Sequence, residues 1–195
     1  MLNDLLVSEV RVKVLKLFFS AGAAEFYHVR EITRRVGTEI NAVRRELIRL
    51  TKAGVLKKEP RGNRLYYRIR GYSAYTSDLY GLVNKEEGIS GAILADLDRL
   101  GTPKIIILTK PFLWGRISSS SEVDLLLVGK INLEVLSNII KDAEQKLGRE
   151  INYTALTEDE FEFRKKRKDP FIVNILLEPR IVVFGDDQKY CQLKI

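Results

Sequence analysis

Residues 39–70 read EINAVRRELIRLTKAGVLKKEPRGNRLYYRIR, and this stretch decides the fold of the first part of the chain. Its first half has the three- and four-residue spacing of an amphipathic helix and ends at Gly54. The residues that this spacing places on the core face are Ile40, Val43, Leu47 and Leu50. Its second half has two extended runs on either side of PRGN at 60–63, a turn signal, so a β-hairpin is predicted after the helix.

Two further helices are predicted before this stretch. Residues 5–20 repeat apolar side chains at helical spacing, and FYHVREITRRVG at 26–37 reads as a short amphipathic helix that Gly37 breaks. Thr38 then stands where the N-cap of the next helix is expected. The residues interpreted as helix-start or packing residues are Tyr27 and His28. A short helix, a tight turn and a second periodic helix make a helix-turn-helix pattern.

In the helix predicted within residues 39–54, the face that lies opposite the core is basic and polar. At about 100° per residue it carries Thr38, Asn41, Arg45, Arg49 and Lys52, with Arg44 on the flank. Arginine can pair with guanine and asparagine with adenine in the major groove, and both also contact phosphates. We expect Asn41 and Arg45 nearest the base edges, and the remaining cations at phosphates.

The predicted hairpin is also basic. Its core-facing side chains are expected to be Val55, Leu56, Leu65, Tyr67 and Ile69. Its basic side chains are Lys57, Lys58, Arg61, Arg64, Arg68 and Arg70. The tip is Arg61-Gly62-Asn63-Arg64, where the arginines can reach backbone phosphate or the minor groove. Three helices followed by a basic hairpin make a winged helix.

The positive charge of the chain is concentrated in this segment. The 195-residue sequence has a net charge of +7. Residues 1–71 hold 16 Lys and Arg against seven Asp and Glu, whereas residues 72–195 hold 17 against 19. A basic first third is expected of a module that meets a polyanion. The alternatives are a charged face that serves only solubility and a winged helix that contacts only protein.

The run NAVRRELIRLTKAGVL followed by RGNRLYYRI resembles the recognition helix and wing of ArsR-like winged-helix regulators, over roughly residues 5–70. The resemblance implies a transcriptional regulator that binds double-stranded DNA sequence-specifically, as a homodimer that meets two half-sites. Metal sensing is not implied, because the sequence has one cysteine, Cys191, and one histidine, His28, in place of the Cys and His ligands of the metal-sensing members.

The rest of the sequence predicts a small mixed α/β domain at 102–195, joined to the winged helix of 1–71 by a linker and connecting helix at 72–101. Strands are expected at KIIILT, SEVDLLLVG, INYTALT and RIVVFG. Helices are expected at NLEVLSNIIKDAEQKLG and across TEDEFEFRKKRKDPFIVNILLEP, where Asp169-Pro170 starts a new helix. The fold class is therefore α+β, an N-terminal winged helix-turn-helix followed by this domain.

The run SSSSEVDLLLVG is similar to the Ser-Asp-x-Asp-Leu-Leu-Val strand of minimal nucleotidyltransferases of the polymerase β type. This resemblance covers roughly residues 89–186, and a fusion to a winged helix is a known arrangement of the family. The chemistry needs a Gly-Ser turn that cradles the triphosphate, two carboxylates that hold two Mg²⁺ ions, and a third carboxylate on a neighbouring strand.

The sequence departs from this pattern at each requirement. Thr109-Lys110-Pro111 stands where the Gly-Ser turn is expected, and INYTAL carries no acid. The carboxylate pair is Glu122 and Asp124, with Glu where the family has Asp. The pair would bind one metal ion or, as we favour, end a strand in solvent. The resemblance then implies a pseudoenzyme without a cofactor, with Mg²⁺ relevant only if nucleotide binding persists.

This degenerate domain is expected to serve dimerisation or the sensing of a nucleotide or protein effector. The alternative is an active, antitoxin-like nucleotidyltransferase that modifies a protein or RNA partner. The basic run Arg164–Lys168 is interpreted as solvated surface, with a second DNA or RNA contact as the alternative.

Composition excludes several other classes. No run approaches the roughly 18 apolar residues that span a bilayer, so a membrane protein is not expected. The first residues, MLNDLLVSEVRVK, lack the pattern of a signal peptide, and a single cysteine cannot form an intrachain disulfide. These features predict a cytoplasmic protein.

Overall fold

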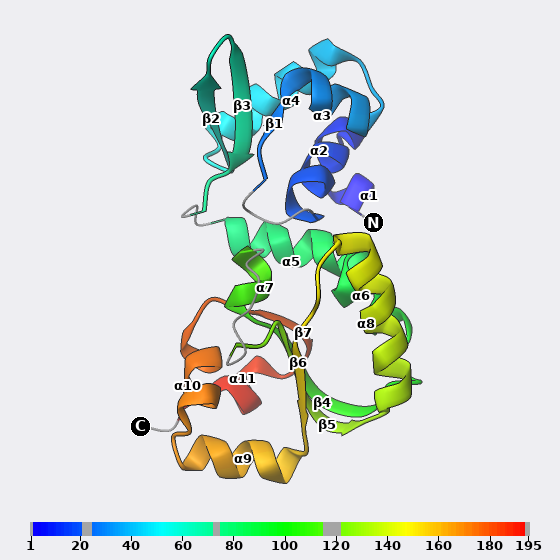
Figure 1. Ribbon diagram of the computed structural model, residues 1–195, viewed down its shortest axis with the longest axis vertical. Coiled ribbons are helices and arrows are strands. Elements are labelled where there is room, and N and C mark those ends of the chain that lie inside the picture. The colour runs from blue at the N-terminus through cyan, green and yellow to red at the C-terminus, as the bar shows by residue number, and fades with distance from the viewer. Residues whose placement is uncertain (1, 21–24, 72–74, 115–121, 194–195) are drawn as a thin grey trace. The chain divides into compact units, whose positions relative to one another are not determined.

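The computed structural model describes residues 2–20, 25–71, 75–114 and 122–193. These residues form a mixed α+β protein with eleven helices and two sheets (Figure 1). The chain divides into two compact units, unit 1 at Met1–Glu86 and unit 2 at Glu87–Ile195. No helix of the described residues is long and apolar enough to cross a membrane.

The helices of unit 1 are α1 (Leu2–Leu6), α2 (Glu9–Ser20), α3 (Val29–Val36), α4 (Ile40–Lys52) and α5 (Thr76–Glu87). The helix predicted at 5–20 is thus two helices, because Val7 adopts a positive φ of 61° and ends α1. Ser8 then accepts a hydrogen bond from the backbone N–H of Arg11 and starts α2. The fully buried side chains between α2, α3 and α4 include Phe18, Phe19, Ile32, Val43 and Leu47.

A three-stranded antiparallel sheet completes unit 1. Its strands are β1 (Tyr27–His28), β2 (Leu56–Arg61) and β3 (Arg64–Ile69), in the order β1-β3-β2. The β2–β3 hairpin is confirmed, but β1 was not predicted, because two residues are too short to show an alternating pattern. Tyr27 is buried against Phe18, with ring centroids 5.4 Å apart, and the imidazole of His28 caps α3 by accepting the N–H of Glu31.

The turn between α3 and α4 differs from the prediction by one residue. Gly37, with a left-handed φ of 65°, ends α3 and donates its N–H to the carbonyl of Thr33. The N-cap of α4 is Glu39, which makes no side-chain capping hydrogen bond, so the prediction of Thr38 as N-cap is wrong. The chain needs both residues after Gly37 to reverse before α4 begins.

The segment at 72–101, predicted as a linker and connecting helix, contains two helices, α5 and α6 (Ile89–Ala95). The structure places α5 in unit 1, where Tyr80 is buried and its ring lies 5.9 Å from that of Phe19. Glu86 accepts the backbone N–H of Leu2 and pairs with Lys16 at 3.3 Å. A helix in this segment was predicted, but its place in unit 1 was not, because the contacts that anchor α5 join residues about 60 or more positions apart.

Unit 2 is built on one four-stranded sheet. Its strands are β4 (Gly101–Leu108), β5 (Leu125–Ile131), β6 (Tyr153–Leu156) and β7 (Ile181–Gly185). The order is β6-β5-β4-β7, with β5 and β6 parallel and the other pairs antiparallel. The helices besides α6 are α7 (Lys110–Trp114), α8 (Leu133–Leu147), α9 (Glu158–Lys166), α10 (Pro170–Leu177) and α11 (Asp187–Cys191). All four predicted strands are confirmed.

Helices cover both faces of this sheet (Figure 1). On one face, Ile105 and Ile107 of β4 and Leu126 and Val128 of β5 pack against buried side chains of α9, α10 and α11. Alternate residues of the same strands point to the other face, which α6 and α8 cover. Leu133 was predicted to face inward but is 57% exposed, because it is the first residue of α8 and lies at its end.

Candidate nucleic-acid interface

The exposed face of α4 carries the residues predicted to contact DNA. Val43, Leu47 and Leu50 are buried on its core face, as the spacing predicted, whereas Ile40 is half-buried. The exposed side chains on the other side are Asn41, Arg44, Arg45, Arg49 and Lys52, and Thr38 in the preceding turn is half-buried. One helix therefore presents four cations and one amide to its surroundings.

Two of these side chains are joined to each other. Nη1 of Arg44 donates to Oδ1 of Asn41 over 3.4 Å, so the amide and the guanidinium lie side by side on the first turns of α4. Burial raises the pKa of the Tyr67 phenol in β3. The positive charge of Arg44 acts in the opposite direction, which indicates that Arg44 lies near this strand. The basic flank of α4 thus adjoins the hairpin within unit 1.

A buried carboxylate behind this face organises two arginines. Glu46 is only 4% exposed, yet its carboxylate accepts from Nε of Arg11 at 2.9 Å and from Nη1 of Arg49 at 2.8 Å. The hydroxyl of Ser8 lies 3.4 Å from the same carboxylate. The side chain of Arg49 remains 62% exposed, so Glu46 anchors a cation that is still displayed.

The protonation of Glu46 follows from this environment. Burial favours its neutral form, but hydrogen bonds and charge interactions with Arg11 and Arg49 outweigh burial and lower the pKa of the carboxyl. The anion therefore persists at neutral pH. Sequence reasoning did not single out Glu46, although an acid next to the core-facing Leu47 in a basic helix was a signal that it needs a partner.

The hairpin tip is a two-residue turn at Gly62 and Asn63, flanked by the facing pair Arg61 and Arg64. Gly62 has a φ of 56°, in the left-handed region that such turns need and that glycine adopts freely. All four tip residues are exposed. Val55, Leu56, Tyr67 and Ile69 are buried as predicted, but Leu65 is 37% exposed because it lies near the tip.

Three of the six hairpin cations converge on one carboxylate. Glu59 pairs with Lys57 at 2.8 Å, with Arg68 at 3.0 Å and with Arg61 at 3.7 Å. Hydrogen bonds from Lys57 and then Arg68 lower the pKa of Glu59. The ring of Phe26 supports the same cluster, because it lies 3.7 Å from the guanidinium carbon of Arg61 and 4.9 Å from that of Arg68.

This cluster separates the predicted wing residues into two kinds. Lys57 and Arg61 are held by Glu59, and Arg61 also by Phe26, so their positions are defined. Arg64, on the other strand of the tip, makes no ion pair with any residue that the structure describes. The sequence prediction named Lys57, Arg61, Asn63 and Arg64 but did not include Glu59 or Phe26.

In unit 2, the structure does not place Glu122 and Asp124 on a strand as predicted. Both lie in the segment before β5, where Glu122 is exposed and Asp124 is completely buried. Nη1 of Arg149 lies 3.3 Å from both Asp124 oxygens, and the N–H of Asn152 donates to Oδ2 over 3.1 Å. The expectation that this pair ends a strand in solvent is therefore wrong for Asp124.

Thr109 and Lys110, which stand where the Gly-Ser turn is expected, are bound to other parts of unit 2. The backbone N–H of Thr109 donates to the carbonyl of Asp124 over 3.0 Å, and its hydroxyl donates to the carbonyl of Val123. Nζ of Lys110 pairs with Glu178 at 2.6 Å. Ser118–Ser121, predicted as a loop, lie outside the described residues. Within the described part of the chain, no group of three or more His, Cys, Asp or Glu side chains is placed to hold a metal ion.

Comparison with known proteins gives little guidance. No known protein family and no curated protein matches the sequence. Among solved structures, the chain is similar to human N-acetylserotonin methyltransferase in complex with SAM, with 18% identity and a TM-score of 0.31. The match covers 74% of this chain and 39% of the methyltransferase, so the chain spans well under half of that protein. A similarity at this level does not bear on fold or activity.

Proposed function

We propose that unit 1 is an ArsR-like winged-helix domain that binds double-stranded DNA and regulates transcription. The observation that carries the proposal is the exposed face of α4, where Asn41, Arg44, Arg45, Arg49 and Lys52 gather on the side opposite the core. Seven carboxylates cannot neutralise the 16 cations of residues 1–71. A concentrated cationic face on an exposed side of a helix is the footprint expected of a phosphate-binding surface.

The proposed roles follow from how each side chain is held. Asn41 and Arg45 are exposed on the face of α4 opposite the core and would reach base edges in the major groove. Arg49 is anchored by Glu46, and a fixed guanidinium suits a phosphate contact that sets the register of the helix. Arg44, Lys52 and Thr38 would complete the contacts of this helix with the sugar-phosphate backbone of the DNA.

The hairpin would form the second contact. Arg61, Asn63 and Arg64 at the tip are exposed and would reach phosphate or the minor groove, with Lys57 further along β2. The Glu59 cluster supports this assignment, because it holds the two strands of the hairpin in place and leaves the hairpin with a net positive charge. One carboxylate faces the three cations Lys57, Arg61 and Arg68.

For unit 2 we propose a nucleotidyltransferase-like domain without transfer activity, which serves dimerisation or effector sensing. The supporting observation is that the Asp124 carboxylate is bound by Arg149 and by the N–H of Asn152, so its oxygens are already satisfied inside the protein. A homodimer would bring two α4 helices to two half-sites and raise both affinity and specificity.

The direct test is DNA binding by the full chain, measured with random-sequence duplexes and with upstream fragments of the source genome. The test variant is Arg45→Ala/Arg64→Ala, which removes one proposed base contact and one proposed phosphate contact. The matched control is Lys141→Ala/Lys146→Ala, which removes two exposed cations from α8 in unit 2. We expect the test variant to bind at least about tenfold more weakly and the control to bind like wild type. Absence of binding at low salt, or equal losses in both variants, would refute the proposal.

A further inference from the structure

Unit 2 contains a cavity of about 840 Å³ between α9, α10 and α11. None of its lining residues is Asp124, a partner of Asp124 or a residue proposed to contact DNA. Its volume falls within the range of sites that hold small organic molecules. The cavity is lined by both charged and apolar side chains, and their distribution indicates what kind of ligand would fit.

Four lysines line this cavity, namely Lys165, Lys166, Lys168 and Lys189. They come from α9, from the turn that follows it, and from α11. The two carboxylates of the lining are Glu158 and Glu162. The lining therefore carries a net positive charge.

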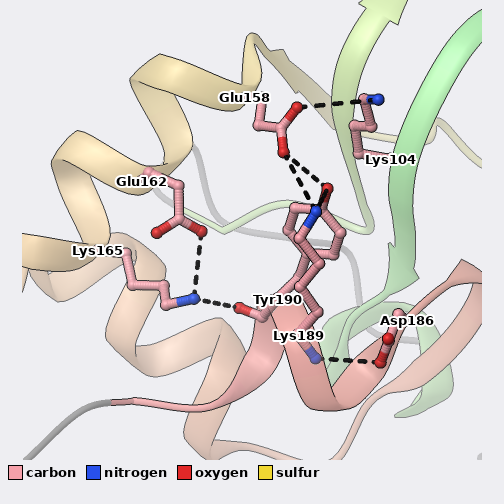
Figure 2. A network of polar contacts seen from close by, with 7 residues as sticks. All are labelled: Lys104, Glu158, Glu162, Lys165, Asp186, Lys189 and Tyr190. Atoms are coloured by element: carbon pink, nitrogen blue, oxygen red, sulfur yellow. Dashed lines mark hydrogen bonds and ion pairs between the residues drawn. The ribbon is translucent and has the colours of Figure 1, made fainter.

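The carboxylates are already occupied by protein groups (Figure 2). Glu162 pairs with Lys165 at 3.3 Å, and Lys165 also donates to the carbonyl of Tyr190 over 2.7 Å. Glu158 accepts the Tyr190 hydroxyl at 2.7 Å and lies 3.8 Å from Nζ of Lys189. Hydrogen bonding from Tyr190, followed by the charges of Lys104 and Lys189, keeps the pKa of Glu158 below its ordinary value.

Two of the four lining lysines, Lys166 and Lys168, take no part in these pairs. Both are exposed, and neither has a carboxylate partner among the residues that the structure describes. Their ammonium groups are thus available to a ligand. The other wall of the cavity is apolar and includes Pro170, Val173 and Leu193.

The basic run Arg164–Lys168 is divided by this geometry. Arg164 pairs with Glu160 at 3.0 Å, and the guanidinium carbon of Arg167 lies 4.8 Å from the ring centroid of Phe163. Neither arginine lines the cavity, whereas Lys165, Lys166 and Lys168 do. A run that reads as uniformly solvated in the sequence therefore has two cations committed to surface contacts and three directed to one hollow.

We infer that this cavity binds a small organic anion, with its negative group at Lys166 and Lys168 and its apolar body against Pro170, Val173 and Leu193. Paired ammonium groups suit a carboxylate, sulfonate or phosphate monoester, and charge-assisted contacts with such groups are stronger than neutral hydrogen bonds. The apolar wall excludes a bare inorganic ion as the best occupant, because that wall would gain nothing from it. The inference concerns unit 2 alone and does not depend on DNA binding by unit 1.

The test uses the full chain and the fluorescent probe 8-anilinonaphthalene-1-sulfonate, an anion with an apolar body, alongside its uncharged analogue N-phenyl-1-naphthylamine. The test variant is Lys166→Gln/Lys168→Gln. The matched control is Arg164→Gln/Arg167→Gln, which removes two charges from the same run outside the cavity. A third variant, Val173→Trp, fills the cavity from its apolar wall without changing the charge.

We expect one saturable sulfonate site in wild type, with affinity at least about tenfold weaker in the lysine variant and within about twofold of wild type in the arginine variant. Val173→Trp should weaken both probes, and the lysine variant should weaken only the charged one. Equal losses in the two charge variants, full binding by Val173→Trp, or the lack of a saturable site would overturn the inference.

Discussion

Glu46 in unit 1 and Asp124 in unit 2 are both buried carboxylates that bind arginine, but the arginines end in different environments. Glu46 holds Arg11 and Arg49, and the Arg49 side chain stays 62% exposed. Asp124 holds Arg149, whose side chain is only 18% exposed and whose guanidinium lies 5.0 Å from the ring of Phe112. The first carboxylate fixes a cation at the surface, and the second withdraws one into the interior.

The difference shows that a buried acid is not by itself a sign of a site. What matters is whether the arginine that pairs with it stays exposed, so that a ligand can reach its donors. Each arginine uses Nη1 to bind its carboxylate, but the Arg49 side chain is 62% exposed and the Arg149 side chain only 18% exposed. Unit 1 thus displays charge on a packed core, and unit 2 uses the same type of pair to join α8, β5 and β6.

The largest effect is expected when the pair between Arg149 and Asp124 is broken. Arg149→Ala leaves the Asp124 carboxylate buried without its cation, which typically costs about 3–5 kcal/mol of unfolding free energy. Denaturant unfolding of the full chain, followed by circular dichroism, measures this loss.

Arg149→Ala/Asp124→Asn is the matched double variant. It removes the buried charge but keeps an acceptor for the N–H of Asn152, so it should recover part of the loss. If Arg149→Ala unfolds at the wild-type denaturant concentration, the pair does not hold unit 2 together.

Loss of the Glu46 charge, which binds Arg11 and Arg49, should give a smaller, pH-dependent effect. Glu46→Gln weakens two charge-assisted hydrogen bonds and should lower the stability of unit 1 by about 1–3 kcal/mol at neutral pH. Because the folded pKa of Glu46 lies below its ordinary value of 4.5, the wild-type advantage is present above that pH. It is lost as pH falls through the folded pKa.

This pH dependence can be followed by denaturant unfolding at a series of pH values, with far-UV circular dichroism as the signal. A difference between Glu46→Gln and wild type that stays constant from neutral to acid pH would mean that the charge of Glu46 does not contribute.

The two tip arginines allow a finer comparison within unit 1. Arg61→Ala removes the contact with Phe26 and the 3.7 Å pair with Glu59, so it should cost about 0.5–1 kcal/mol of stability. Arg64→Ala should leave stability unchanged, although both variants should weaken DNA binding. Thermal unfolding of the two variants side by side distinguishes them, and equal melting temperatures would argue against a supporting role for Phe26.

The smallest expected effect at neutral pH concerns a third buried acid, which stays neutral. Burial, followed by a hydrogen bond with Asp187, raises the pKa of the Cys191 thiol from 9.0 to about 11. Its contribution to stability is therefore complete below pH 9 and is lost as pH rises towards 11. At pH 8 the native thiol should react with iodoacetamide about a hundredfold more slowly than in the unfolded chain. Equal rates would show that Cys191 is accessible and unperturbed.

The parts of the fold that the sequence predicted depend on local signals. The spacing of Val43, Leu47 and Leu50 fixed the core face of α4, and Asp169 before Pro170 marked the start of α10. All four strands of unit 2 contain apolar runs long enough to be read directly. The errors lie at element ends, as for Leu133 and Leu65, where burial depends on how far the neighbouring elements extend.

The candidate site was predictable in its composition but not in its internal contacts. Exposure of the α4 cations follows from helical periodicity alone. The partners that hold them are distant in sequence, since Glu46 meets Arg11 across 35 residues, and Phe26 meets Arg61 only when β1 joins the sheet. The pairing of Asp124 with Arg149 is likewise a tertiary contact, so the resemblance to a metal-binding strand could not reveal it.

The measurement that tests the central claim most directly is the salt dependence of DNA affinity for wild type, Arg64→Ala and Lys141→Ala. Over about 50–200 mM salt, the logarithm of the binding constant should fall linearly with the logarithm of salt concentration. If unit 1 binds phosphates through its basic face, Arg64→Ala should reduce this slope by about one, and Lys141→Ala should leave it unchanged. Identical slopes for all three proteins would contradict the account.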